Sequence, residues 1–317
     1  MNALPDLDAI RDAAARIAPH AVVTPVLRSA ALDVLAGAEL HFKCENLQRG
    51  GAFKFRGACN AVWSLTEDEA AHGVVTHSSG NHGNALALAA ATRGIAAHVV
   101  VPEGAVQAKL DAIARAGGTL HRCAPSQSAR EAMCAEVQAR TGAVLVHPYA
   151  DAWVMAGQGT IALELLRQAP TLDALVTPVG GGGLAAGVAI AAHALKHGLA
   201  LFAAEPAGAD DAARSLAAGS RVAAMTPDTV CDGLRALVGE PNLDALRAQR
   251  VEVVTVTDAE TIDAMRLLWG ELKQVVEVSS ATVLAAILKQ PRRFIGKRVG
   301  VVLTGGNVDL DALPWFA

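Results

Sequence analysis

Aromatic residues and cysteines are both scarce in this sequence of 317 residues. Phe, Trp and Tyr together make up 3% of the chain, and Tyr149 is its single tyrosine. The five cysteines are scattered and odd in number, and no Cys-x-x-Cys pair occurs, which argues against a disulfide framework and against a cysteine-rich zinc site. We therefore expect a cytoplasmic protein with reduced thiols. The cysteines are Cys44, Cys59, Cys123, Cys134 and Cys231.

Charge blocks and long apolar runs are also missing. Lys and Arg number 27 against 31 Asp and Glu, a net charge of -4, and no basic cluster stands out, so nucleic acid is not an expected partner. No apolar stretch reaches the ~18 residues of a membrane span. Residues 1–20 lack the continuous apolar segment of a secretory signal. With 52% apolar residues, the chain predicts a helix-rich globular protein, and its length favours two domains.

Apolar β-branched runs alternate with alanine-rich helical runs in the first half of the chain. This βαβαβαβ order is typical of a parallel sheet covered by helices. The expected strands are 73–77, 97–101, 119–123 and 143–146, and the expected helices are 84–92, 106–116 and 126–140.

The pattern then restarts, which predicts a second α/β layer. Ligands in such sheets bind beyond the carboxyl ends of the strands, so we expect a crevice there. The expected strands are 174–178, 201–204 and 299–303, and the expected helices are 184–196, 261–272 and 281–288.

Lys54 lies in the segment Gly-Gly-Ala-Phe-Lys-Phe-Arg-Gly. An ordinary surface lysine has no need of two flanking phenylalanines. Packing between Phe53 and Phe55 would remove water from the amine, lower its pKa and leave it nucleophilic.

Four consecutive glycines follow the expected strand 174–178 and precede a helix. A tight turn requires one or two glycines, whereas four let backbone N–H groups converge on a phosphate. A lysine that forms a Schiff base and a phosphate cup together point to pyridoxal phosphate. The glycines are Gly180, Gly181, Gly182 and Gly183, and Leu184 follows them.

A dinucleotide site is the competing interpretation of the same loop. Gly180-x-Gly182-x-x-Ala185 fits the dinucleotide fingerprint, and Glu205 stands near the position of a ribose-binding acid. A nicotinamide-dependent oxidoreductase would leave Lys54 unexplained.

The turn Ser-Ser-Gly-Asn-His-Gly opens the helix expected after strand 73–77. Hydroxyl, amide and N–H groups at a helix N-terminus suit a carboxylate, although a plain N-cap by Ser79 or Asn81 is the simpler alternative. The polar side chains of this turn are Ser78, Ser79, Asn81 and His82.

Two further segments carry candidate ligands. Thr304 ends an expected buried strand. If the pyridine nitrogen of pyridoxal phosphate faces this hydroxyl, it stays largely unprotonated, which disfavours transamination.

The loop Glu-Pro-Ala-Gly-Ala-Asp-Asp, from Glu205 to Asp211, offers oxygen ligands for a hard divalent cation, or is simply a solvated acidic loop.

Taken together, these motifs resemble the fold-type II pyridoxal-phosphate enzymes, in particular the serine racemase and serine/threonine dehydratase group. Their order matches over nearly the whole chain, and the segments 146–148, 156–162 and 303–310 match as well. The resemblance implies a large cofactor-binding domain of residues 1–70 and 151–317, a small domain of residues 71–150 that closes over substrate, and a homodimer.

The resemblance also implies residue roles. Lys54 would hold pyridoxal phosphate covalently beside Phe53, Asn81 would bond the ring 3-oxygen, Gly180 to Leu184 the phosphate, and Thr304 the ring nitrogen. The substrate carboxylate would lie at Ser78, Asn81 and His82, and Ser79 would face Cα opposite Lys54. Glu205, the Ala209 carbonyl and Asp211 match a divalent-cation site, such as one for Mg²⁺.

Some residues depart from the group's usual pattern and leave the substrate open. Ala52 and Thr304 replace common serines, and Glu277-Val278-Ser279-Ser280 replaces a Glu-Pro-Thr/Ser-Gly segment. No regulatory domain of the biosynthetic threonine enzymes is expected, which favours a catabolic or racemising role.

The function we expect is dehydration of a β-hydroxy amino acid (serine, threonine or 3-hydroxyaspartate) to a 2-oxo acid and ammonia. Racemisation with Lys54 and Ser79 as the two bases is the alternative. A non-catalytic carrier of the cofactor is a third possibility. A β-carboxylate substrate would require another cation, for which Arg130 is a candidate.

Overall fold

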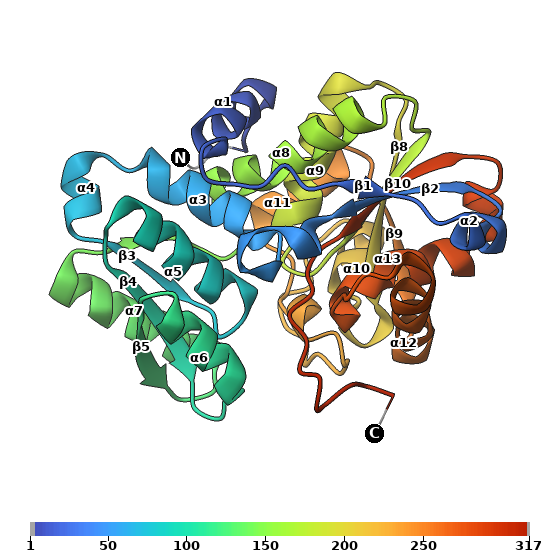
Figure 1. Cartoon of the computed structure of the whole chain (residues 1–317). Coiled ribbons are helices and arrows are strands. Elements are labelled where there is room, and N and C mark those ends of the chain that lie inside the picture. Colours follow the sequence, from blue (N-terminus) through green and yellow to red (C-terminus); the bar gives the residue numbers. More distant parts are fainter. Residues whose placement is uncertain (1–3, 316–317) are drawn as a thin grey trace.

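Two separate β-sheets organise the chain, and the computed structural model describes residues 4–315 (Figure 1). The larger sheet has six strands in the order β1-β2-β10-β7-β8-β9, and all neighbours are parallel except β1 and β2. Its strands are β1 Val26–Leu27, β2 Glu39–Cys44, β7 Ala174–Pro178, β8 Ala200–Pro206, β9 Glu252–Val256 and β10 Arg298–Leu303.

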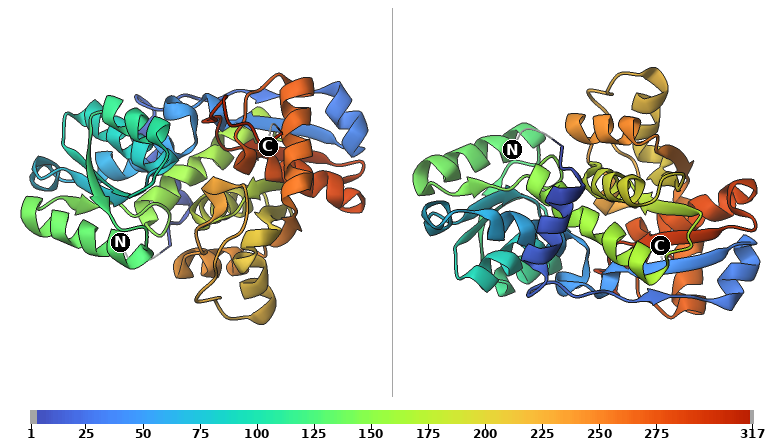
Figure 2. Two further views of the ribbon diagram at one scale, coloured as in Figure 1. Left: turned by 90° about the horizontal axis from the view of Figure 1, so that it is seen from below. Right: turned by 90° about the horizontal axis from the view of Figure 1, so that it is seen from above.

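The smaller sheet has four parallel strands in the order β5-β4-β3-β6. It lies beside the larger sheet, and both views in Figure 2 separate the two halves clearly. The strands are β3 Val74–His77, β4 Ala97–Pro102, β5 Gly118–Cys123 and β6 Val144–Leu145.

Helices cover both faces of each sheet. Apolar residues of α1, α8, α9 and α11 pack on one face of the larger sheet, and those of α2, α12 and α13 on the other. In the smaller half, α3, α5 and α6 cover one face and α7 the other. The first seven helices are α1 Leu7–Ile17, α2 Ala30–Ala36, α3 Lys54–Ser64, α4 Glu67–Ala71, α5 Asn81–Arg93, α6 Gln107–Arg115 and α7 Gln127–Thr141. The others are α8 Ala152–Gln168, α9 Gly183–Leu195, α10 Asp211–Ala218, α11 Glu240–Ala248, α12 Asp258–Leu267, α13 Val278–Lys289 and α14 Pro291–Phe294.

Side-chain caps fix where many helices begin, because an Asp, Ser or Thr oxygen accepts a first-turn N–H group that has no partner within the helix. Asp6, Ser29, Thr66, Ser126, Asp151 and Thr257 do this for α1, α2, α4, α7, α8 and α12. The helices that follow the Ser78 turn and the glycine loop, α5 and α9, have no such cap.

The expected α/β architecture with mostly parallel sheets is confirmed, with small shifts at the ends of elements. The helix expected at 84–92 begins at Asn81, directly after the polar turn. The helix expected at 261–272 is α-helical to Leu267 and continues as a π-helical turn, Leu268–Leu272. The domain boundaries after residues 70 and 150 stay a prediction, and the core of the smaller half also takes in Phe55 and Val62 of α3.

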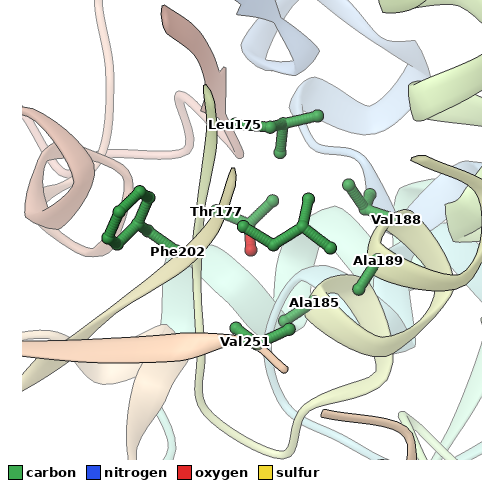
Figure 3. Close-up of a pocket in the computed structure, with 8 residues that line it drawn as sticks. Leu175, Thr177, Ala185, Val188, Ala189, Phe202 and Val251 are labelled. Carbon is green, nitrogen blue, oxygen red and sulfur yellow. The ribbon is translucent and has the colours of Figure 1, made fainter. Parts of the chain in front are cut away.

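The core of the larger half is closely packed. A cavity of about 10 Å³ lies between β7, β8 and α9, where Thr177 is the single polar residue among apolar neighbours (Figure 3). One water molecule needs about this much space together with several polar partners. The cavity is therefore a packing gap and cannot hold a substrate.

Among residues 4–315, no helix is both long enough and apolar enough to cross a membrane.

Candidate active site

The Lys54 segment is held against the end of β10. The backbone N–H of Phe53 donates to the Thr304 carbonyl at 2.9 Å, and Ala52 forms a β-bridge with Gly305. Two motifs that lie 250 residues apart in the sequence (304 − 54) are therefore adjacent in space.

Lys54 is the first residue of α3. Its Nζ donates to the Pro148 carbonyl at 2.9 Å and lies 5.2 Å from the centre of the Phe53 ring. Removal from water lowers the pKa of the amine to about 8, and the Glu277 carboxylate opposes this shift. The neutral fraction near neutral pH is therefore far larger than that of an ordinary lysine, as a nucleophile or base requires.

The expectation that Phe55 also flanks the amine is wrong. Phe55 is fully buried in the core beside α5, and Arg49 lies over its ring. Successive side chains of a helix point about 100° apart, so Lys54 and Phe55 cannot share one face.

His147 supports the turn that places the Pro148 carbonyl. Its Nδ1 accepts the backbone N–H groups of Tyr149 and Ala150 at 3.3 and 3.0 Å. Burial, with the charges of His77 and Lys54, lowers the pKa of His147 to about 4, which keeps this acceptor nitrogen unprotonated.

The glycine loop is a cradle that no larger residue could form. Gly182 has a positive φ of 88°, and a Cβ on Gly181 would lie 2.4 Å from the Tyr149 ring. A Cβ on Gly183 would lie 2.8 Å from the Tyr149 carbonyl. Helix α9 begins at Gly183 without a side-chain cap, so its first N–H groups suit an anion, and Leu184 is buried in this first turn.

Asn242 holds this loop and was missed in the sequence. Its fully buried side-chain amide donates to the carbonyls of Gly181 and Tyr149, and its Oδ1 has no partner within the described part of the chain. Asn242 lies 61 residues beyond Gly181, so no local motif marks it.

The Ser78 turn is not a plain N-cap. Gly80 occupies the cap position of α5, and neither Ser79 nor Asn81 caps the helix. A Cβ on Gly83 would lie 2.1 Å from the Ser78 carbonyl, so glycine is needed to close the turn on the helix. Ser79 forms no hydrogen bond within residues 4–315, whereas the Ser78 hydroxyl accepts from Gly80 at 3.4 Å.

His82 lies below this turn and is 2% exposed. Its Nε2 is 3.4 Å from the Val146 carbonyl, and its Nδ1 has no partner in the structure as described. Burial, with the Lys54 charge, holds the pKa of His82 well below its usual range. Because the neutral ring donates Nε2–H to the Val146 carbonyl, its Nδ1 is an acceptor, and the N–H groups at the uncapped N-terminus of α5 are the donors available to a small anionic ligand.

Glu277 is a functional candidate to which the sequence assigned no role, although its segment departs from the group's usual pattern. Its carboxylate accepts the Asn81 amide at 2.9 and 3.0 Å, and the Asn307 amide donates to Asn81 Oδ1 at 2.9 Å. Burial raises the pKa of Glu277 to about 7, and the hydrogen bond from Asn81 opposes the shift. What marks Glu277 in the structure is a buried carboxylate with no cationic hydrogen-bond partner. Burial is not visible in a single sequence, so this mark could not be seen there.

Thr304 is 4% exposed, and its backbone N–H donates to the Ser280 hydroxyl at 2.8 Å. Its own hydroxyl forms no hydrogen bond within residues 4–315. It is therefore available to a ligand that lies next to Lys54.

The acidic loop is linked to the glycine cradle through Val238, whose side chain lies beside Gly182. Both Glu205 oxygens accept N–H groups of α10, from Ala212 and Ala213 at 2.8 Å, and Asp211 accepts the Val238 N–H at 2.7 Å. Burial raises the pKa of Glu205 to about 8, and Asp211 and Asp210 add to the shift. Two buried acids that repel one another fit a cation between them. Residues 4–315 nonetheless contain no group of three or more His, Cys, Asp or Glu side chains arranged for a metal.

The dinucleotide hypothesis is not supported by this geometry. Its ribose-binding acid, Glu205, is 0% exposed and directs both oxygens to α10. The structure instead joins a low-pKa lysine and an uncapped glycine cradle through Pro148 and Tyr149, and the helix that follows the polar turn reaches the same segment through His82 and the Val146 carbonyl. These residues fit pyridoxal phosphate, which needs an amine for its aldehyde and an anion site for its phosphate.

Comparison with known proteins also points to pyridoxal phosphate. Residues 17–305 match the family model described as pyridoxal-phosphate dependent enzyme. The β-hydroxyaspartate dehydratase of Paracoccus denitrificans is 51% identical over 300 residues, and the match covers 95% of both chains. The serine racemase of Arabidopsis thaliana is 49% identical over 313 residues, 97% of this chain and 95% of that one. The maize serine racemase structure has a TM-score of 0.95 at 44% identity, covering 98% of this chain and 95% of that one. The chain therefore belongs to the pyridoxal-phosphate-dependent enzymes of fold type II, and within them to the serine/threonine dehydratase-like kind.

Proposed function

We propose that this enzyme dehydrates a β-hydroxy amino acid to a 2-oxo acid and ammonia, and that 3-hydroxyaspartate is its preferred substrate. The observation that carries the proposal is the Lys54 amine, which is buried, donates to the Pro148 carbonyl next to the Tyr149 wall of the glycine cradle, and has its pKa lowered to about 8. Identity of 51% to a β-hydroxyaspartate dehydratase supports the substrate class.

Each residue has a distinct task in this proposal. Pyridoxal phosphate, when bound, supplies the electron sink that makes the substrate Cα–H acidic. Lys54 holds the cofactor and, once released by the incoming substrate, removes the Cα proton. The β-hydroxyl then takes up the proton that Lys54 carries and leaves as water, and hydrolysis of the released enamine gives the 2-oxo acid and ammonia. Phe53, Asn81 and Thr304 orient the ring, and the loop from Gly180 to Leu184 binds the phosphate.

The substrate carboxylate is assigned to the Ser78 turn. Ser78 and Asn81 donate hydrogen bonds there, the neutral His82 lies in the same first turn of α5, and the N–H groups of α5 add a favourable dipole. A carboxylate fixed at this point presents Cα to Lys54.

Arg130 is the candidate for the second carboxylate of 3-hydroxyaspartate. It lies on α7, and its side chain forms no hydrogen bond or ion pair among the described residues, although its Nε is buried. The Arg130 charge lowers the pKa of His77, and the ring of His77 contacts that of His147 at 5.3 Å between centroids. A half-buried guanidinium without a partner suits an anionic ligand.

The test is release of ammonia and 2-oxo acid from serine, threonine and each stereoisomer of 3-hydroxyaspartate. We expect Arg130→Ala to lower kcat/KM for 3-hydroxyaspartate by roughly 10–100-fold, the value of a charge-assisted hydrogen bond, and to change serine turnover little. Arg122→Ala, which removes an exposed cation of β5, is the matched control. Equal losses for both substrates would exclude a β-carboxylate role. Bound cofactor with no turnover of any substrate would identify a carrier.

Racemisation is the second candidate, favoured by Ser79, whose hydroxyl forms no hydrogen bond in residues 4–315, and by the identity to serine racemases. If Ser79 returns a proton to the face of Cα opposite Lys54, Ser79→Ala abolishes racemisation while dehydration of L-substrates continues. Chiral chromatography after incubation with L-serine measures this, and Ser78→Ala is the comparison. Unchanged racemisation in Ser79→Ala would remove that role.

The proposal includes a divalent cation such as Mg²⁺ at Glu205, the Ala209 carbonyl and Asp211. The two buried carboxylates and the raised pKa of Glu205 support it. We also propose a homodimer in the cytoplasm, in keeping with five free, buried cysteines. Light scattering of the purified protein tests the dimer.

A further inference from the structure

Two histidines with no part in the proposed reaction lie side by side on the smaller sheet. His98 is on β4 and His121 on the neighbouring strand β5, where it pairs with Val100. Side chains alternate along a strand, so both histidines share the face of Val100 and Cys123, which pack against Cys134 and Val137 of α7.

The ring nitrogens face one another. His98 Nδ1 and His121 Nε2 are 3.2 Å apart, with ring centroids at 5.2 Å and an interplanar angle of 51°. When two nitrogens bind one zinc ion at ~2.0–2.1 Å each, an N–Zn–N angle between about 90° and about 109° puts the nitrogens about 2.9–3.4 Å apart. The observed distance between the two ring nitrogens falls in this range. Both rings are partly exposed to solvent.

Charged side chains of α7 act on the pair. Glu136 on α7 raises the pKa of His121, while Arg140 lowers the pKa of both rings, and burial is the largest cause of lowering for each. Glu136 is exposed and forms a 3.4 Å ion pair with Arg140, which costs little to break. Neutral imidazoles are the form that binds metal.

We propose that His98 and His121 form a binding site for a transition-metal dication such as Zn²⁺, with water completing the coordination. Imidazole nitrogens select such ions over Mg²⁺, so this site differs in chemistry from the oxygen ligands at Glu205 and Asp211. His98 pairs with Val75, near the start of β3, whereas the Ser78 turn follows its end. Bound metal thus links β4 and β5 without contacting Lys54.

Calorimetric titration of the holoenzyme with Zn²⁺, in excess Mg²⁺, tests the proposal. We expect His98→Ala and His121→Ala each to weaken one Zn²⁺ site by at least about 10–100-fold, since the loss of second-shell partners alone has that effect. Zn²⁺ should also raise the thermal midpoint of the wild type more than that of either variant. Dehydratase activity in the absence of Zn²⁺ should be unchanged in both.

A second histidine pair provides the matched control. His193 and His197 are four residues apart, and their rings contact edge to face at 5.6 Å without a hydrogen bond between nitrogens. His193→Ala should leave the Zn²⁺ site intact. Wild-type Zn²⁺ affinity in both His98→Ala and His121→Ala would overturn the proposal and leave a simple hydrogen bond between the rings.

Discussion

Glu205 and Glu277 show how one physical cause prepares two carboxylates for different tasks. Burial raises the pKa of both, to about 8 and about 7. Glu277 accepts the amide of Asn81, a side chain assigned to the cofactor, whereas Glu205 lies beside Asp211 and accepts backbone N–H groups. The neighbouring groups, rather than the pKa itself, therefore separate a site carboxylate from a candidate cation ligand.

The raised pKa of Glu205 predicts the pH dependence of cation binding. An acid with a pKa of about 8 is largely protonated below that pH, and a cation must displace the proton. Mg²⁺ affinity should thus rise as the pH increases through 8, and Glu205→Gln should abolish binding. Calorimetry below and above pH 8 measures this, with the exposed Glu240→Gln as control. Wild-type Mg²⁺ binding by Glu205→Gln would contradict the assignment.

At the scale of elements, the position of α3 depends on a buried ion network. Arg56, two residues after Lys54, is 0% exposed and forms bidentate pairs with Glu45 and Glu164 at 2.7–2.8 Å. Lys43 donates to the same Glu164 at 2.6 Å. Because a guanidinium has five donors in a fixed plane, the first turn of α3 can take one orientation only.

Arg56→Lys should therefore destabilise the protein markedly. An ammonium cannot satisfy both carboxylates, and breaking a buried pair costs about 3–5 kcal/mol. Urea unfolding of the holoenzyme measures the loss. Arg11→Lys, which alters an exposed pair with Asp8 on α1, should cost well under ~1 kcal/mol. A loss in Arg56→Lys as small as that of the control would refute the role of the network.

At the scale of the molecule, the site lies where the two sheet-centred halves meet. Asn81 on α5 reaches Glu277 and Asn307 of the larger half, and Lys109 on α6 pairs with Asp232. Pro148, from the segment that joins the halves, accepts the Lys54 amine. A substrate held at the Ser78 turn would therefore contact both halves at once.

The sequence predicted the strands, the glycine loop and the polar turn because each has a local signature. Lys54, Asn81 and Thr304 were predicted as site residues in this way. Glu277, Asn242 and Arg56 were not, because their roles depend on burial and on partners 196, 61 and 108 residues away. The interpretation of Phe55 failed for a related reason: adjacency in sequence does not put two helical side chains on one face.

The covalent attachment of the cofactor to Lys54 is the central claim, and one measurement tests it directly. Holoenzyme reconstituted with pyridoxal phosphate is reduced with borohydride, digested and mapped by mass spectrometry. The account predicts a phosphopyridoxyl group on the peptide that contains Lys54, and none in Lys54→Ala. Modification of another lysine, or full activity in Lys54→Ala, would contradict it.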